Sequence, residues 1–213
     1  MSTSRSRPAP PVPARPTLGR LGSAVQGCRA CNLWEGATQA VIGEGDAHAR
    51  LMLVGEQPGD REDRQGHPFV GPAGAVLDRA LERAGIGREE VFLTNVVKHF
   101  RYKLRGKRRI HQRPDRWQVS ACLPWLDAEL AVVRPEALVL LGATAAQALL
   151  GPQIRIGRDR GRPLDSDLAR LVTVTAHPSS ILRAGEDRDR HAAMDALVAD
   201  LERVAADLAC SEA

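Results

Sequence analysis

The sequence predicts an α/β protein whose parallel sheet is covered by helices on both faces. Short apolar runs at residues 51–54, 91–97, 137–141 and 171–175 have the length and composition of buried strands. Segments with helical spacing or helix-boundary residues separate these runs. Alternating strands and helices favour parallel pairing, because each crossover helix covers one face of the sheet.

Local signals place each element along the chain. The first strand, at residues 51–54, opens into the tight Gly55–Gly59 loop. Apolar residues at helical spacing then predict a helix over residues 73–84, which Gly85 ends. The later elements are the strand at 91–97, a helix from Pro114 to about Val133, the strand at 137–141, a short helix at 144–150, a surface loop at 157–168, the strand at 171–175 and a last helix at 187–208.

Length and composition indicate one globular domain. The 213 residues are enough to bury a substantial core. Residues 1–18 are rich in Pro, Ser and Arg, so we expect a disordered tail there and a single domain over residues 19–213. No apolar run reaches the ~20 residues that span a bilayer, and residues 1–18 lack the apolar stretch of a signal peptide. We therefore expect a cytoplasmic protein without a membrane segment.

A dense cationic block predicts a nucleic-acid partner. Between Lys98 and Arg116 there are nine Lys or Arg residues and a single acidic one, Asp115. Such a block repels itself unless a polyanion binds it. The segment Lys107-Arg108-Arg109-Ile110-His111 supplies candidate phosphate contacts and ends in a histidine. A neutral imidazole can act as a nucleophile at neutral pH, so His111 is a catalytic candidate; the alternative is a solvated loop whose histidine has no role.

Polar residues follow the predicted strands at the edge where parallel sheets bind ligands. Glu56 and Gln57 come after the first strand, Asn95 lies near the end of the second, and His177 follows the fourth. Their convergence predicts a site, although His177 alone is equally typical of a histidine that caps a proline turn. Phe69, flanked by Pro, Gly and His, is either a platform for base stacking or a core residue.

Three cysteines suggest a metal site. Cys28 and Cys31 form a Cys-x-x-Cys pair, and Cys122 lies far downstream; without a secretion signal this pattern favours metal binding or redox chemistry over a disulfide. Cys210 lies too close to the chain end for a well-positioned ligand. The candidates are a zinc site of three cysteines and one histidine, or a four-iron cluster in which histidine replaces one thiolate. His99 is the candidate for the fourth ligand.

Several long motifs in the same order resemble the uracil-DNA glycosylase superfamily, specifically its iron–sulfur branch. They are GEQPGDREDRQGHPFVGPAG (55–74), TNVVKHF (94–100), KRRIH (107–111), HPSSILR (177–183) and the Cys28, Cys31 and Cys122 set. Ordinary members of that branch carry GEAPG and a Lys-Cys pair, where this chain has GEQPG and Lys98-His99. These differences, with KRRIH, resemble the UdgX subgroup, whose members become covalently bound to uracil-containing DNA. The histidine at 99 supports His99 as the fourth ligand of a [4Fe-4S] cluster, with structural zinc as the alternative.

The resemblance implies a three-layer α/β/α fold and a flipped-out uracil in a pocket at the strand ends. Asp60 and Asp63 are further, less specific candidates for the site. The implied uracil-binding residues are Phe69, which stacks on the base, Asn95, which recognises its hydrogen-bonding edge, His177, which contacts the uracil carbonyl, and Gln57. The implied catalytic residues besides His111 are His177 and the pair Glu56 and Gln57, which lie beside the deoxyribose and the attacking group. The expected DNA contacts are Lys107, Arg108, Arg109, Ser179 and Arg183.

We therefore expect an enzyme that excises uracil from DNA, preferably single-stranded, and is left attached through His111 to C1′ of the abasic deoxyribose. Reaction would be single-turnover, and the protein would act as a monomer associated with the nucleoid. The alternatives are a conventional uracil-DNA glycosylase that turns over, with His111 only contacting DNA, and a noncatalytic single-strand binding module.

Overall fold

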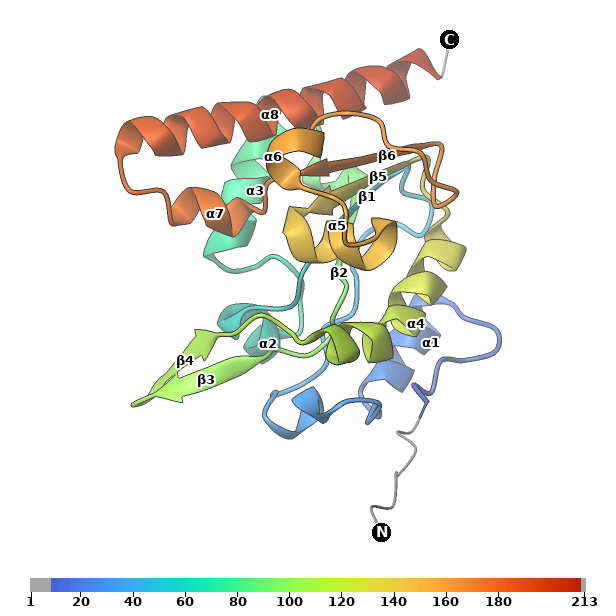
Figure 1. The fold of residues 1–213 in the computed structure, drawn as a ribbon. Helices are drawn as coiled ribbons and strands as arrows, with labels where there is room; N and C mark the ends of the chain where they lie inside the picture. Colours follow the sequence, from blue (N-terminus) through green and yellow to red (C-terminus); the bar gives the residue numbers. More distant parts are fainter. Residues whose placement is uncertain (1–8, 212–213) are drawn as a thin grey trace.

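A four-stranded parallel sheet forms the centre of the protein in the computed structural model, which describes residues 9–211. The strands are β1 (Leu51–Gly55), β2 (Val91–Asn95), β5 (Ala137–Leu141) and β6 (Leu171–Thr175), paired in the order β2-β1-β5-β6 (Figure 1). All four predicted strands are confirmed; β2 ends at Asn95, two residues before the predicted boundary.

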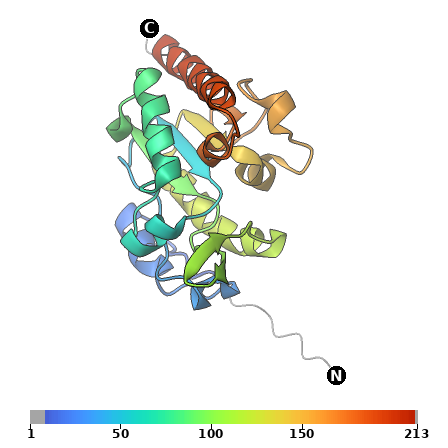
Figure 2. The ribbon, with the colours of Figure 1, turned by 90° about the vertical axis from the view of Figure 1, so that its left-hand side faces the viewer.

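Helices cover both faces of this sheet, which confirms the three-layer α/β/α arrangement (Figure 2). Alternate side chains of a strand point to opposite faces: Met52 and Val54 enter one buried cluster, while Leu51 and Leu53 enter the other. The first cluster packs against α1 (Leu18–Val25), α4 (Arg116–Val133) and α5 (Gly142–Leu150). The second packs against α3 (Pro72–Arg83), α7 (Pro178–Leu182) and α8 (Asp187–Cys210).

The strand order creates a crevice between β1 and β5. From β1 the chain moves to β2 on one side, and it then crosses to β5 on the other side. In open parallel sheets, ligands bind outside the carboxyl ends of the strands at such a reversal. Glu56 follows β1 and Gly142 follows β5, so the fold brings these two chain segments together at the sheet edge.

The basic block forms a β-hairpin, where the sequence predicts only a loop. Strands β3 (Tyr102–Arg105) and β4 (Arg108–His111) pair antiparallel, and the hairpin projects from the body of the molecule (Figure 1). Gly106, at φ 60°, adopts the left-handed conformation that the two-residue turn requires. Tyr102 lies opposite His111, which places the histidine at the base of the hairpin, next to the sheet edge.

The remaining differences from the predicted elements are local. Helix α4 begins at Arg116 after Pro114, and a short helix, α6 (Ile156–Asp159), extends into the predicted 157–168 loop. Helix α1 begins at Leu18, at the end of the predicted tail, whose residues 1–8 lie outside the described range. Helices α1 and α7 were not predicted, and neither were α2 (Asp60–Gln65) and the 3-10 turn η1 (Asn32–Glu35). A further 3-10 turn, η2 (Arg88–Glu90), directly precedes β2. No helix within residues 9–211 is long and apolar enough to cross a membrane.

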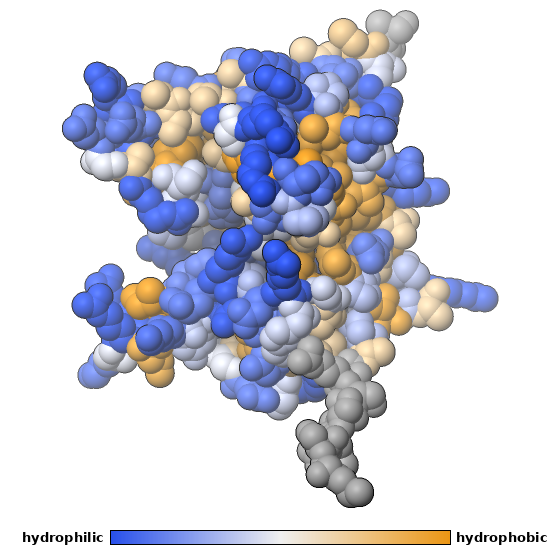
Figure 3. All heavy atoms as spheres, in the orientation of Figure 1, coloured by the Kyte–Doolittle hydropathy of each residue, from blue (hydrophilic) through white to orange (hydrophobic). Residues whose placement is uncertain are grey.

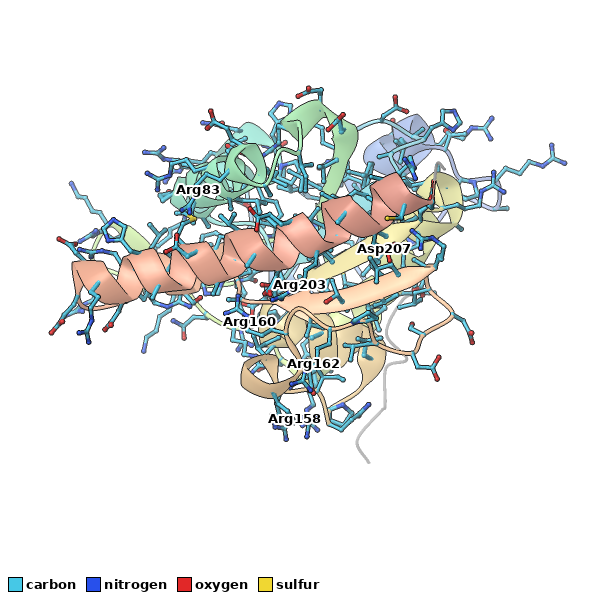
Figure 4. All side chains as sticks on the ribbon, turned by 90° about the horizontal axis from the view of Figure 1, so that it is seen from above. Arg83, Arg158, Arg160, Arg162, Arg203 and Asp207 are labelled. Carbon is cyan, nitrogen blue, oxygen red and sulfur yellow. The ribbon has the colours of Figure 1, made fainter. Side chains whose placement is uncertain are left out.

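Helix α8 is fixed to the sheet by a buried carboxylate. Asp200 is 4% exposed and accepts hydrogen bonds from Thr175 Oγ1 at 2.6 Å and from Arg160 Nη2 at 2.8 Å. Arg203 Nη1 reaches its other oxygen at 3.0 Å, and Figure 4 shows Arg160 and Arg203 together beside α8. Three donors on one carboxylate offset the cost of burying its charge.

Thr173 on β6 offers a test of how polar groups are buried in this sheet. It is 3% exposed, and its hydroxyl has no hydrogen-bond partner among the described residues. Because an unpartnered buried hydroxyl destabilises the fold, we expect Thr173→Val to raise the free energy of unfolding by about 1 kcal/mol, measured by urea denaturation. Thr175→Val is the matched control, since it removes the bond to Asp200 and should lower stability. Equal losses in both variants would contradict this account.

Candidate functional site

A cavity of about 970 Å³ opens at the carboxyl ends of the central strands. In Figure 3 the left side of the molecule is hollowed between α7 above and the β3–β4 hairpin below. The lining includes residues from every predicted motif other than the cysteine set, namely Glu56, Gln57, Asp60, Phe69, Asn95, His111, His177, Ser179 and Arg183. The predicted convergence of these segments at one edge of the sheet is therefore found in the structure.

Phe69 and Asn95 meet at the inner end of the cavity, over Gly55. A Cβ atom on Gly55 would lie 2.4 Å from Asn95 Oδ1 and 2.8 Å from Phe69 Cζ, so only glycine admits both side chains. Phe69 adopts a positive φ of 55°, and its carbonyl approaches Gly74 so closely that a Cβ there would lie 1.7 Å from it. Phe69 is a core residue, as one of the two sequence interpretations expects, and it also lines the cavity. Its role as a platform for base stacking stays a prediction.

His177 presents one defined ring nitrogen to the cavity. Its Nδ1 accepts a hydrogen bond from the Ser179 backbone N–H at 3.1 Å, which caps α7 as the alternative interpretation expects. A nitrogen that accepts from an amide carries no proton, so a neutral ring holds its hydrogen on Nε2. The ring centroid lies 6.3 Å from that of Phe69, at an interplanar angle of 28°. His177 can therefore cap a helix and donate a hydrogen bond from Nε2.

Burial sets the protonation state of His177. Desolvation, together with the charges of His111 and Arg183, lowers the pKa of His177 to about 4, although Glu56 acts to raise it. We therefore expect the ring to stay neutral at pH 7 and to titrate near pH 4 in an NMR pH titration, with His177→Gln identifying the resonance. Because the unfolded chain binds a proton near pH 6.5, this histidine contributes stability that is full above that pH and is lost as the pH falls toward 4. A midpoint near 6.5 would contradict this assignment.

Glu56 and His111 face each other at the mouth of the cavity. Glu56 Oε1 lies 3.3 Å from His111 Nε2, and Glu56 Oε2 accepts a hydrogen bond from Thr144 Oγ1. Burial raises the pKa of the Glu56 carboxyl, but the hydrogen bonds from His111 and Thr144 and the charges of both histidines outweigh it, so the pKa lies below the usual value. The site thus holds an ionised carboxylate beside an imidazole that is 53% exposed. A carboxylate in this position can accept a proton from the ring or stabilise nearby positive charge.

The side-chain amide of Gln57 is hydrogen-bonded to the backbone at the base of the hairpin. Its Nε2 donates to the carbonyl oxygens of Arg101, at 3.2 Å, and Gln112, at 2.9 Å, while its Oε1 accepts from the Arg101 N–H at 2.9 Å. These residues flank the two ends of the β3–β4 hairpin. The amide therefore clamps the hairpin base next to His111, and the role in contacting uracil or the sugar that the resemblance implies for Gln57 stays a prediction.

Arg109 points inward and pairs with α2. Its guanidinium forms ion pairs with Asp60 and, at 2.6 Å, with Asp63, which is fully buried. It also lies over the ring of Tyr102, with its Cζ 5.0 Å from the centroid. Asp60 and Asp63 thus fix the hairpin to the body of the protein. The phosphate contact predicted for Arg109 remains untested, and in this structure the side chain is already paired.

The other predicted DNA contacts lie on both sides of the cavity mouth. Lys107 and Arg108 are exposed at the tip of the hairpin. On the opposite side, exposed Arg183 donates from Nη1 to Ser179 Oγ at 3.0 Å, and both residues line the cavity. Positive charge thus lies on both sides of the cavity, and the contacts with DNA predicted for these residues stay predictions.

The four predicted metal ligands come from three separate segments of the chain: Cys28 and Cys31 from one, and His99 and Cys122 from the other two. Cys28 and Cys122 are buried and accept N–H bonds at sulfur, from Trp125 Nε1 at 3.3 Å and from the Lys98 backbone at 3.2 Å. Burial raises the pKa of the Cys122 thiol to about 12, and the charges of Cys31 and Cys28 add to this increase. The charge and the backbone N–H of Lys98 act in the opposite direction and lower the pKa. Within residues 9–211 no three His, Cys, Asp or Glu side chains meet in a geometry that holds a metal ion.

The donor chemistry of Cys28, Cys122 and His99 nevertheless fits a metal group. N–H donors at sulfur stabilise thiolates, which are the form of cysteine that binds metals. His99 is 5% exposed, and burial, with the charge of Arg29, lowers its pKa to about 4, so the imidazole is neutral and able to act as a ligand.

Sequence reasoning did not identify Thr144 and Arg113, which both line the cavity. Thr144 follows β5 by three residues, so the strand-end rule that found Glu56 and His177 would also have found it. Arg113 lies two residues after His111, and nothing in the basic run distinguishes it from its neighbours.

Comparison with known proteins identifies the family. A profile described as the uracil DNA glycosylase superfamily matches residues 42–202. The type-4 uracil-DNA glycosylase of Thermotoga maritima is 38% identical over 160 residues, covering 75% of this chain and 80% of that protein. The type-4 enzyme of Pyrobaculum aerophilum is 35% identical over 173 residues, covering 78% and 85%, and the type-5 enzyme of the same organism is 32% identical over 150 residues, covering 63% of each. The motifs, the α/β/α fold and these matches agree: the chain belongs to the uracil-DNA glycosylase superfamily.

Proposed function

We propose that this protein excises uracil from DNA and is captured by its product through a bond from His111 to C1′ of the deoxyribose. Similarity to the type-4 enzymes supports the excision. The observation that carries the capture is the pairing of His111 Nε2 with Glu56 Oε1 at 3.3 Å, at the mouth of a cavity walled by Phe69 and Asn95. The KRRIH and GEQPG segments, which resemble the UdgX subgroup, support the same assignment.

Bond cleavage places charge on both fragments. The electrons of the N-glycosidic bond leave with uracil, so the base gains negative charge and the sugar gains oxocarbenium-like positive charge. His177, neutral and protonated on Nε2, donates toward the uracil carbonyl, and Asn95 binds the hydrogen-bonding edge of the base, which stacks on Phe69. The ionised Glu56 stabilises the sugar cation.

Capture then competes with hydrolysis. A ring nitrogen of His111 gives its lone pair to C1′, and the proton that the imidazole loses passes to Glu56 or to solvent. The product is an imidazole–deoxyribose bond and free uracil. An alkylated imidazole leaves poorly, so the enzyme stays attached and reacts once. The clamps from Gln57 and from Arg109 hold His111 in place for this attack.

DNA binding is proposed to favour single strands. A base must leave the stack to enter the cavity, and single-stranded DNA lowers that cost. Lys107, Arg108 and Arg183 would hold the flanking phosphates, so affinity should fall steeply with salt and depend little on sequence.

Denaturing gel electrophoresis tests this function. Purified protein is incubated with a labelled single-stranded oligonucleotide that contains one uracil, beside a thymine control. A uracil-dependent band that survives SDS and heat, with peptide mapping to His111, is the expected result. Alkali-sensitive cleavage at the uracil without such a band supports the second candidate, a conventional glycosylase that turns over, which the type-4 similarity also favours. Equal binding of both strands without base release indicates a noncatalytic module.

We further propose that Cys28, Cys31, His99 and Cys122 hold a [4Fe-4S] cluster, with structural zinc as the alternative. The N–H bonds to two of the sulfurs and the neutral buried imidazole support this donor set. Such a group would supply a structural cross-link between the segments before η1, after β2 and within α4. The residues themselves do no chemistry on uracil in this proposal.

Removal of one ligand should therefore impair folding before it impairs uracil excision. We expect Cys122→Ser to lose most of the soluble protein, together with bound metal measured by iron and zinc analysis and visible absorption. Cys210→Ser, at the exposed end of α8, is the matched control and should leave all of these unchanged. A soluble, fully folded Cys122→Ser protein without metal and with unchanged activity would count against a structural cluster.

A further inference from the structure

The two oxygens of Glu56 have different partners. Oε1 faces His111, while Oε2 accepts a hydrogen bond from Thr144 Oγ1. Thr144 is 8% exposed and lies in the first turn of α5, so its hydroxyl reaches Glu56 across the crevice between β1 and β5. One oxygen of the carboxylate is therefore held, and the other is left for the reaction.

The direction of these hydrogen bonds is fixed by Arg113. Its Nε lies 3.1 Å from Thr144 Oγ1, and an arginine nitrogen only donates, so the threonine oxygen accepts there. The single hydroxyl hydrogen of Thr144 is then available for Glu56 Oε2. A donor that itself accepts from a cation is polarised and makes a stronger bond to a carboxylate.

Arg113 also ties together the two segments that carry the reacting groups. It follows His111 by two residues, and its Nη2 reaches Gln147 Oε1 on α5 at 3.4 Å. The chain leaving the hairpin is thus attached to the helix that holds Glu56. The distance between Glu56 and His111 depends on this attachment as well as on the Gln57 clamp.

We propose that Thr144 and Arg113 form a relay of positioning residues that fixes Glu56 with Oε1 toward His111 and the sugar. The proposal rests on the proposed role of Glu56 in uracil excision, and it names two residues that act only through that carboxylate. It differs from a purely structural role for Thr144 in one respect: its effect on the reaction must disappear when the Glu56 charge is removed.

Single-turnover release of uracil from a single-stranded oligonucleotide provides the test. Thr144→Val keeps the side-chain shape but removes the hydroxyl, and we expect it to slow release by about tenfold or more, since a hydrogen bond to a charged group is lost. Thr144→Ser keeps the hydroxyl and should restore most of the rate. Thr173→Val is the control for a buried threonine, since Thr173 lies in the middle of β6, two strands away from β1, which Glu56 follows, and it should leave the rate unchanged.

A double-mutant cycle separates positioning from folding. In a Glu56→Gln background we expect Thr144→Val to change the rate by less than about twofold, because the two residues act as one unit. Arg113→Ala should likewise slow release in the wild type and have little effect with Glu56→Gln. Additive losses, or failure of Thr144→Ser to restore the rate, would overturn the relay. The readout is uracil release, so absence of the His111 adduct would refute covalent capture without affecting this test.

The pKa of Glu56, measured by NMR, tests the proposal even if the protein releases no uracil. Glu56 faces His111 on β4, His177 before α7 and Thr144 on α5, and the threonine bond is one of the causes that lower the Glu56 pKa. In carbon-13 NMR titrations, Thr144→Val should raise the pKa of the Glu56 carboxyl, and Thr144→Ser should bring it back toward the wild-type value. An unchanged Glu56 titration in Thr144→Val would overturn the proposal even if the protein released no uracil.

Discussion

Replacing His111 with alanine is expected to abolish the DNA adduct, with a loss of more than about a hundredfold in covalent product. The imidazole is the nucleophile in the proposed reaction, and His111 is the residue of the β3–β4 hairpin that lines the cavity, so no other hairpin side chain is placed there to form the bond to C1′. The side chain is 53% exposed and ends β4, so its removal leaves no buried cavity and should not affect folding. The loss is measured as the uracil-dependent band on a denaturing gel.

His67→Ala is the matched control for this variant. His67 is also an exposed histidine paired with a glutamate, at 3.0 Å from Glu44 Oε2, but it does not line the cavity. It should leave the adduct unchanged. In His111→Ala, water can occupy the vacated space beside Glu56, so slow uracil release without an adduct is a further expected result. Wild-type amounts of adduct in His111→Ala would eliminate this residue as the nucleophile.

Replacing Glu129 with leucine is expected to cost about 3–5 kcal/mol of stability, because it leaves a buried charge without its partner. Lys98 and Glu129 are both fully buried, with Nζ 2.7 Å from Glu129 Oε2. The carboxylate also accepts from the backbone N–H of Gly43 and from Thr94 Oγ1. Lys98 in turn donates to the Asn95 carbonyl at 2.6 Å, so the same pair supports the strand end that carries Asn95.

Urea denaturation of three variants checks this prediction. The double variant Lys98→Met with Glu129→Leu removes both charges and should recover a large part of the loss, since apolar residues of similar volume can replace a buried ion pair. Glu136→Leu breaks the solvent-accessible pair with Arg50 and should cost far less stability, because water screens such a pair. If Glu129→Leu cost no more than Glu136→Leu, the buried pair would be unimportant for stability.

The strands and the position of the site could be predicted from the sequence because they depend on local patterns. Runs such as 137–141 are apolar throughout, since a parallel strand between two helical layers is buried on both faces. Glu56 and His177 follow such runs directly, so topology alone places them at one edge of the sheet.

The hairpin was missed because its pairing is weakly encoded. Tyr102–Arg105 and Arg108–His111 are mostly exposed and strongly basic, a composition typical of a solvated loop. What holds them is supplied by residues distant in the sequence: Gln57 binds the backbone at both ends, and Arg109 pairs with Asp60 and Asp63. No pattern within the basic run could show that one arginine points inward.

The sequence by itself determined the α/β layers, the family and the segments that meet at the strand ends, since burial periodicity and strand-end position are written in neighbouring residues. Only the tertiary structure decided which atoms face each other: Gln57 toward the hairpin, Thr144 toward Glu56, and Glu56 toward His111. The physical reason is that the two kinds of interaction differ in how far apart in the sequence their partners lie and in how strongly they depend on direction. Apolar burial is nondirectional and leaves a local pattern, whereas a hydrogen bond requires two groups from distant segments to arrive within about 3 Å at the right angle.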